Sequence, residues 1–94
     1  MTVIYVRGEI DMETCAHLRD AIESHLGPDQ RVVLELSGVT FTDSSILKVL
    51  VQARGRLTAD GGSLVLRNPS EAAHRLLTVT QAQSLLDAVE REEQ

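Results

Sequence analysis

Two adjacent hydroxyls follow an aspartate in the segment "TFTDSSIL", where Asp43, Ser44 and Ser45 precede a run with helical spacing. Asp43 or Ser44 is expected to cap that helix, since a side-chain oxygen at a helix start accepts an unpaired backbone N–H, a contribution of about 1 kcal/mol. The cap does not use both serines. A hydroxyl just inside the helix start lies among free N–H groups at the positive end of the helix dipole, which suit a phosphate. Ser45 is therefore a candidate phosphoacceptor, and Ser44 is the alternative.

A hydrolytic role for either serine would need a histidine base and an oxyanion hole in close geometry. The three histidines are better explained as surface residues. His17 and His74 fall on polar faces of expected helices, and His25 lies near a helix C-terminus, where a cation interacts well with the dipole. They also lack the spacing of metal ligands. These observations argue against a hydrolase, and we predict no catalytic residue, no metal and no cofactor.

Length and composition bound the possible partners. A chain of 94 residues is long enough for one domain, residues 1–94, with a core of its own. A net charge of -5 argues against binding to a phosphate backbone, and an aromatic content of 2% argues against base stacking, so no nucleic-acid partner is expected. No apolar run approaches the length of about 18 residues that spans a bilayer. With no signal-peptide pattern at the N-terminus, the sequence predicts a cytoplasmic protein without membrane contact.

Cys15 is the only cysteine, which excludes an intramolecular disulfide and a paired-thiol metal site. It begins an apolar stripe that continues with Leu18, Ile22 and Leu26. We therefore interpret Cys15 as a small buried hydrophobic residue rather than a reactive thiol.

Strand and helix patterns alternate along the chain. β-Branched and aliphatic runs predict strands, apolar residues at helical spacing predict helices, and Gly-Pro, Gly-Gly and Asn-Pro-Ser mark the ends. The final segment from Gln83 favours a helix, with a short strand at 85–89 as the alternative. The expected strands are 2–7, 31–37 and 63–67. A loop from Gly8 follows the first strand, and a loop at 38–45 follows the second. The expected helices run from an N-cap at Asp11 to about Leu26, from Ile46 to Asp60, and, after an N-cap at Ser70, over 71–79.

This alternation predicts an α/β fold in βαβαβα order, with a small parallel or mixed sheet of three or four strands covered by three or four helices. In such a sheet every strand-to-helix loop emerges at the carboxyl edge, where open α/β sheets place their sites. Three segments are expected to meet there: Gly8–Met12, Val39–Ser45 and Asn68–Ser70.

The segment "VVLELSGVTFTDSSILKVLVQARGRLTADGGSLVLRNPS" resembles the STAS domain of bacterial anti-sigma factor antagonists. The shared features are an apolar strand, an Asp-Ser-Ser loop, a helix, a Gly-Gly turn, a strand and Asn-Pro-Ser. "GEID", from Gly8 to Asp11, resembles the first loop of that family. The resemblance covers about Val3 to Val79.

The resemblance implies a protein-binding switch that is not an enzyme but the substrate of its partner. In that family the unmodified domain binds an anti-sigma factor that is also a serine kinase of the histidine-kinase-like ATPase class, and this frees the sigma factor. Phosphorylation two positions after the aspartate, here at Ser45, ends binding, and a phosphatase restores the protein. The implied partner-binding residues are Gly8, Glu9, Asp11, Thr42, Asp43, Ser44, Ser45 and Ile46.

Ile46 stands where the family usually has glycine, beside the phosphoacceptor. This departure favours a second interpretation, in which the chain is an unphosphorylated STAS scaffold or an accessory subunit of a transport or sensor complex.

Overall fold

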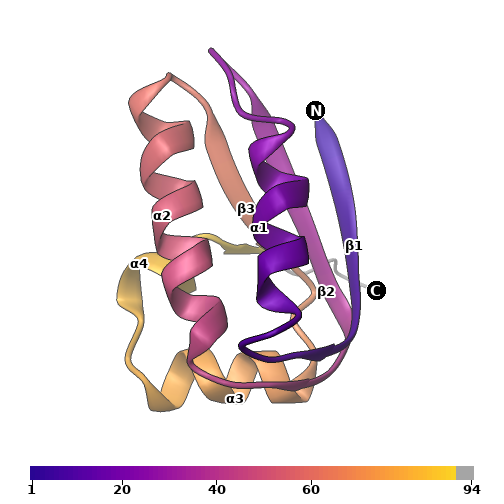
Figure 1. The fold of residues 1–94 in the computed structure, drawn as a ribbon. Helices are drawn as coiled ribbons and strands as arrows, with labels where there is room; N and C mark the ends of the chain where they lie inside the picture. Colours follow the sequence, from indigo (N-terminus) through magenta and orange to yellow (C-terminus); the bar gives the residue numbers. More distant parts are fainter. Residues whose placement is uncertain (91–94) are drawn as a thin grey trace.

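The fold is a four-stranded sheet with its helices interleaved along the chain (Figure 1). The structure is a computed structural model that describes residues 1–90, the side chains of residues 83 and 84 excepted. Its elements are β1 (Thr2–Ile10), α1 (Cys15–Glu23), β2 (Arg31–Thr42), α2 (Ser45–Ala59), β3 (Ser63–Arg67), α3 (Glu71–Val79), α4 (Gln83–Leu86) and β4 (Val89–Glu90).

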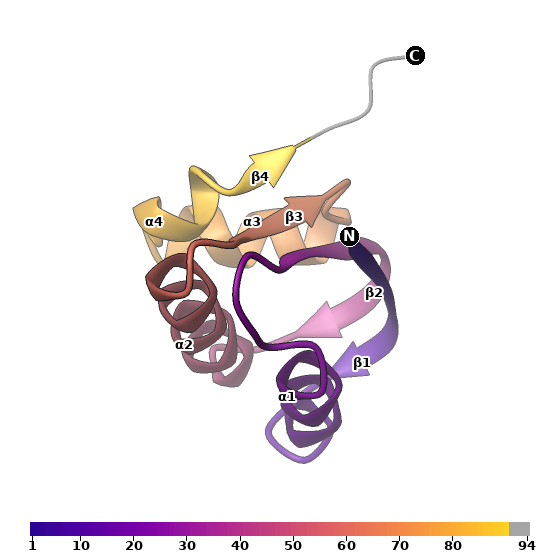
Figure 2. The same cartoon turned by 90° about the horizontal axis from the view of Figure 1, so that it is seen from above.

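All four strands are parallel, and their order in the sheet, β1-β2-β3-β4, is their order in the sequence. The predicted α/β fold with a small parallel sheet is therefore confirmed. Helices α1 and α2 stand side by side on one face of this sheet, as the view from above shows (Figure 2). Helix α3 crosses beneath the carboxyl ends of the strands (Figure 1). The strand-to-helix junctions of β1 and β2 consequently lie at the same end of the molecule.

The core lies between the sheet and helices α1 and α2, and it also takes in Leu77 of α3 and Leu85 of α4. Its centre is a row of β2 side chains that face α1 and α2, and burying each such side chain contributes about 1.5 to 3 kcal/mol. Cys15 packs against this core and is half-buried, in agreement with its predicted structural role. The largest fully buried side chains are Ile22, Leu34, Leu36, Leu50, Leu57, Leu66, Leu85, Val32 and Val33.

The first two strands are longer than predicted. β1 continues through Ile10, and β2 continues through Thr42, so the expected loops from Gly8 and at 38–45 are largely strand. The two extensions pair with each other, with Arg7 opposite Gly38 and Ile10 opposite Thr42. Local sequence hides this pairing, because glycines interrupt both runs and the register shifts twice, so that β2 holds two more residues than β1 over the same span.

Helix α1 is shorter than predicted at both ends. It begins at Cys15 with Thr14 in the N-cap position, so the assignment of Asp11 as N-cap was wrong. Asp11 instead organises a turn that precedes the helix. At the other end the helix stops at Glu23, and the N–H groups of His25 and Leu26 close further turns onto Ile22 and Glu23.

The end of α2 agrees with the prediction, because the helix stops at Ala59 with Asp60 as its C-cap. Gly61 adopts a left-handed φ of 82°. A Cβ atom at Gly62 would lie 2.0 Å from the backbone oxygen of Gln30, so no side chain fits there. The Gly-Gly pair is thus a close-packed turn into β3.

The later elements agree with the predictions in part. β3 and α3 have the expected bounds, and the Ser70 hydroxyl caps α3 by accepting the N–H of Ala73 at 3.2 Å. The tail combines both interpretations, since a single helical turn, α4, precedes the short strand β4. Leu85 anchors this turn and is fully buried. The predicted continuation of the helix over 91–94 lies outside the described residues.

Candidate functional site

The junction between β2 and α2 holds the two serines. The Asp43 Oδ1 atom accepts the backbone N–H of Ser45 at 2.9 Å and also the Ser45 hydroxyl. Ser44 occupies the N-cap position, but its side chain makes no capping hydrogen bond. Asp43 is therefore the cap of α2, and Ser45 is the first residue of the helix.

The side chains of this junction differ in their access to solvent. Ser44 is exposed and Ser45 is half-buried, whereas Ile46 is only 3% exposed. The Ile46 side chain belongs to the hydrophobic core, so it supports the junction from beneath and does not crowd the Ser45 hydroxyl from the solvent side. A direct partner contact by Ile46 stays a prediction, and its side chain contributes almost no surface to one.

A second aspartate organises the junction between β1 and α1. The Asp11 Oδ1 atom accepts the N–H groups of Glu13 and Thr14, each at 3.0 Å, and lies 3.1 Å from the Thr14 hydroxyl oxygen. That hydroxyl oxygen accepts the N–H of Asp11 at 2.8 Å and lies 3.0 Å from the Glu9 carbonyl oxygen. Hydrogen bonds from the Thr14 backbone, and then from its hydroxyl, hold the pKa of Asp11 below its ordinary value of 3.8.

Sheet pairing brings the two junctions together. Glu9 pairs with Phe41, and Ile10 pairs with Thr42, so the segment from Gly8 to Asp11 runs beside the segment that leads to Asp43. Gly8 lies inside β1 with a left-handed φ of 80°, a conformation that glycine adopts without the strain of a Cβ atom. The first two predicted segments therefore meet as expected.

The third segment, Asn68–Ser70, meets only the start of the second, because Ser70 lines a shallow pocket with Val39 and Thr40. β3 ends at Arg67, which pairs with Glu35, while β2 continues for roughly 20 Å beyond that point. The N–H of Ser70 binds the Leu36 carbonyl oxygen at 3.2 Å, well before the end of β2. The expectation that all three segments meet is therefore confirmed only in part, since the longer β2 carries Asp43 and the two serines beyond the end of β3.

A buried ion pair fixes the end of β3. The Glu35 carboxylate binds Arg67 Nε at 2.8 Å and lies 3.4 Å from Asn68 Nδ2 and from the N–H of Ser37. Burial alone would raise the pKa of Glu35, but the hydrogen bonds from Arg67 and Ser37 outweigh it and hold the pKa below its ordinary value of 4.5. The pair thus ties the start of the third loop to β2.

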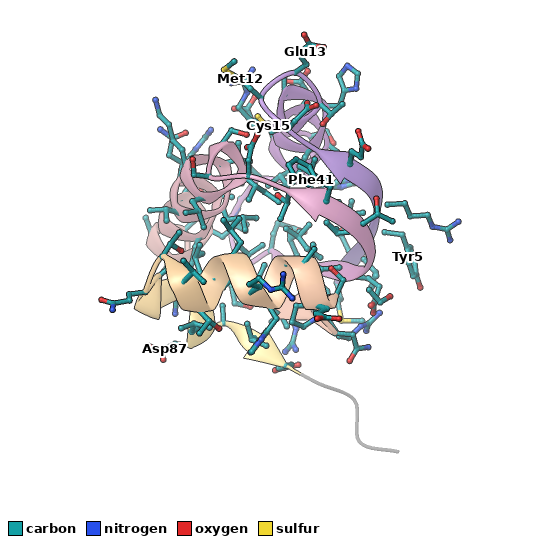
Figure 3. The ribbon with its side chains drawn as sticks, turned by 90° about the horizontal axis from the view of Figure 1, so that it is seen from below. Tyr5, Met12, Glu13, Cys15, Phe41 and Asp87 are labelled. Carbon is teal, nitrogen blue, oxygen red and sulfur yellow. The ribbon has the colours of Figure 1, made fainter. Side chains whose placement is uncertain are left out.

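Two apolar residues at this edge were not identified from the sequence. Met12 is 76% exposed and Phe41 is 51% exposed. Figure 3, which views the molecule from below, shows both at the end where the junctions lie, with Met12 next to Cys15. A solvent-facing Phe41 had no local signal, since its orientation depends on the irregular pairing of β1 with β2.

The histidines do not support a catalytic arrangement. His17, His25 and His74 are exposed, and His25 follows the C-terminal end of α1, at the opposite end of the molecule from the serines (Figure 1). Within residues 1–90, no group of three or more His, Cys, Asp or Glu side chains could hold a metal ion.

A groove of about 470 Å³ lies between α1 and α2, away from the serines, and its lining includes Ile22, Ala53 and Arg56. In the described part of the chain, no helix has the length and apolar character needed to span a membrane.

Comparisons with known proteins match this arrangement. A family model described as "Mlab, STAS domain" covers residues 1–87. The anti-sigma-B factor antagonist of Bacillus subtilis (strain 168) is 33% identical over 86 residues, which is 89% of this chain and 77% of that protein.

Two groups of solved structures share the fold. The anti-sigma factor antagonist SpoIIAA in its unphosphorylated form gives a TM-score of 0.77 at 23% identity, over 99% of this chain and 81% of that one. The phosphorylated form of SpoIIAA from Bacillus gives 0.77 at 24% identity, over 99% and 84%. The STAS domain of a SulP transporter from Vibrio cholerae gives 0.67 at 15% identity, over 97% and 72%.

The family model ends at residue 87, and the assignment of all 94 residues to one domain stays a prediction. The match over most of the chain, together with the curated relative, is sufficient to place the protein. The chain belongs to the STAS domain family and, within it, to the anti-sigma factor antagonists.

Proposed function

We propose that this protein is a phosphorylation-controlled binding switch. Its unmodified form binds an anti-sigma factor that is also a serine kinase of the histidine-kinase-like ATPase class, and thereby frees the sigma factor. Phosphorylation of Ser45 ends that binding, and a phosphatase restores it. In this proposal the protein is a cytoplasmic regulator and acts as the substrate of its partner; the family it belongs to consists of non-enzymatic binding proteins.

The observation that carries the proposal is the position of the Ser45 hydroxyl. Ser45 is the first residue of α2 and is half-buried, and its hydroxyl donates a hydrogen bond to the Asp43 carboxylate. The partial positive charge of the helix start stabilises an anionic group at this position. The two solved forms of SpoIIAA, unphosphorylated and phosphorylated, support phosphate transfer in a relative with the same fold.

The geometry also explains why a phosphate would change binding. In the transfer, Ser45 Oγ gains the γ-phosphoryl group of ATP, ADP leaves, and the hydroxyl proton is lost to solvent. The Asp43 carboxylate then loses the hydrogen bond from the Ser45 hydroxyl and faces a phosphate that carries about 1.5 to 2 negative charges. Glu9, near the end of the neighbouring strand β1, and Asp11, directly after that strand, add to the negative charge beside which the phosphate would have to be buried in the interface. Each 1.4 kcal/mol of lost interaction lowers affinity tenfold, so a few kcal/mol suffices to release the partner.

The test combines mass spectrometry with binding. Incubation with ATP and each candidate anti-sigma serine kinase should add one phosphate, located at Ser45 by peptide mapping. Ser44→Ala is the matched control and should still accept it, whereas Ser45→Ala should not. Ser45→Ala should bind the kinase constitutively, and Ser45→Asp should bind poorly. Equal affinity of these two Ser45 variants contradicts the proposal, and phosphate at Ser44 moves the switch by one residue.

The second candidate is a constitutive scaffold or accessory subunit of a transport or sensor complex. The similarity in fold to the STAS domain of a SulP transporter is the observation that favours it. Ile46 no longer does, because its side chain is buried in the core, whereas Ser45 is half-buried and keeps part of its surface in solvent. A chain that takes up no phosphate from any candidate kinase but co-purifies with a membrane transporter would favour this second candidate.

A further inference from the structure

Two large apolar side chains stand in solvent at the edge that holds the phosphoacceptor. Met12 follows Asp11 in the first junction, and Phe41 lies two residues before Asp43 in the second. They are 76% and 51% exposed. Figure 3 shows Met12 next to Cys15, whose thiol donates to the Met12 carbonyl oxygen at 3.4 Å. Phe41 pairs with Glu9, three residues before Met12, at the same carboxyl edge of the sheet. The two side chains therefore belong to one surface rather than to separate parts of the molecule.

The sheet itself turns Phe41 toward solvent. Val39, two residues earlier, is only 2% exposed, and in a regular strand residues two apart point to the same face. The register, however, shifts at this point. Gly8 pairs with Val39, but the next residue, Glu9, pairs with Phe41, so β2 holds one extra residue. Such a bulge re-aims the side chains that follow it, and bulges are frequent next to functional sites.

Met12 is presented by a turn that is fixed on both sides. The Asp11 carboxylate accepts the N–H groups of Glu13 and Thr14, so the backbone at Met12 is held before any partner arrives. A flexible, polarisable side chain on a fixed backbone suits an interface, because it adapts to its recess while little backbone freedom is lost on binding.

The charge around the two side chains indicates the chemistry of the partner. Segments 9–14 and 40–46 carry four carboxylates and no basic residue: Glu9, Asp11, Glu13 and Asp43. A partner surface with an apolar recess bordered by arginine or lysine is complementary to this edge. A second copy of the chain would instead bring four carboxylates against four, which is unfavourable.

We infer that Met12 and Phe41 are the apolar anchors by which this edge docks onto a basic-rimmed apolar recess of its protein partner. The inference rests on the proposed function, which makes that partner the serine-kinase anti-sigma factor. It adds residues that lie outside the Asp-Ser-Ser motif, and it assigns the affinity of the unmodified state to apolar contact. A phosphate at Ser45 cancels that affinity because it is costly to desolvate at an apolar contact and repels the Asp43 carboxylate beside it.

The experiment measures the affinity of each purified candidate kinase for the wild-type chain and for Phe41→Ser and Met12→Ser. Each substitution should weaken binding about 30-fold, the loss typical of a hot-spot residue. Matched controls are Tyr5→Ser and Val79→Ser, which remove side chains that are 62% and 73% exposed elsewhere. The controls should bind as the wild type does, and circular dichroism with urea titration verifies that every variant folds.

The outcomes separate this inference from the proposed function. If the wild type binds and Ser45→Asp does not, while Phe41→Ser and Met12→Ser bind within about twofold of the wild type, the anchors are wrong and the switch stands. If no kinase binds the wild-type chain, both fail. If the wild type forms a homodimer in sedimentation that Phe41→Ser dissolves, the occupant is a second copy, and the assignment to a kinase is overturned.

Discussion

The two strand-to-helix junctions at the carboxyl edge contain the same pair of residue types, an aspartate and a hydroxyl residue, but bond them differently. Each has an aspartate whose Oδ1 atom accepts the N–H of a nearby hydroxyl residue together with its hydroxyl. In the first junction that residue is Thr14, whose oxygen also accepts the Asp11 N–H and lies within hydrogen-bond distance of the Glu9 carbonyl oxygen. In the second junction Ser45 donates to Asp43, and Ser45 is the residue on the helix start.

The difference lies in how many hydrogen bonds each hydroxyl makes within its junction. The Thr14 hydroxyl accepts the Asp11 N–H and lies within hydrogen-bond distance of the Asp11 carboxylate and the Glu9 carbonyl oxygen. Removing it would therefore break several hydrogen bonds of the turn. The junction at Ser45 keeps its cap even when the hydroxyl is removed, because Asp43 also holds the Ser45 backbone N–H at 2.9 Å. A sequence scan for "Asp then hydroxyl" treats the two alike, whereas their hydrogen bonding differs: the Thr14 hydroxyl is tied to three groups and the Ser45 hydroxyl to Asp43.

The largest stability effect should separate Thr14 from Ser45 directly. Thr14→Val removes an acceptor for the Asp11 N–H and should lower the free energy of unfolding by about 1 to 3 kcal/mol. Ser45→Ala should lower it by less than about 1 kcal/mol, since only the hydroxyl bond to Asp43 is lost. Urea denaturation followed by circular dichroism measures both. Equal losses would show that the two junctions are built alike.

A smaller effect should identify the cap of α2. Asp43→Ala removes the acceptor of the Ser45 N–H and should cost about 1 kcal/mol. Ser44→Ala is the neighbouring control and should stay within about 0.5 kcal/mol of the wild type, because its side chain makes no capping bond. Thermal unfolding of the two variants measures the difference. A larger loss for Ser44→Ala would reverse the assignment of the cap.

The smallest effect is a pH dependence at the first junction. The pKa of Asp11 is lowered in the folded protein, so its stabilisation is complete above the ordinary pKa of 3.8 and is lost as the pH falls through the lowered value. The stability gap between the wild type and Asp11→Asn should therefore be constant at neutral pH and narrow below 3.8. Urea titrations at a series of pH values measure this gap. A gap that widens with acid would mean that the Asp11 carboxyl stabilises the turn in its protonated form.

Elements that depend on neighbouring residues were predictable from the sequence. The apolar spacing after Ser45 gave helix α2, and the Gly-Gly pair gave its end. Asn-Pro-Ser correctly placed Ser70 as the cap of α3. In each case the physical cause lies within a few residues of its effect, as for a cap that bonds three residues away or a glycine that ends a helix.

Features that depend on pairing between distant segments were not predictable. The extension of β2 to Thr42 exists because it pairs with Gly8–Ile10, some 30 positions away, through a shifted register. The inward orientation of Ile46 follows from where α2 lies on the sheet, and the exposure of Phe41 follows from the bulge opposite Glu9. The sequence also predicts Asp11 as a helix cap, because an N-cap aspartate accepts the N–H groups two or three residues later. The Asp11 turn uses the same hydrogen bonds, although the helix begins only at Cys15.

The sequential strand order has a consequence for synthesis. Since each strand pairs beside the one made before it, no later strand must be inserted between two earlier ones. Both junctions, their helices and the apolar anchors lie within the first 59 residues. A chain leaves the ribosome N-terminus first, so both junctions emerge before β3 and β4 do, and the first two strands can pair before the rest of the sheet is available.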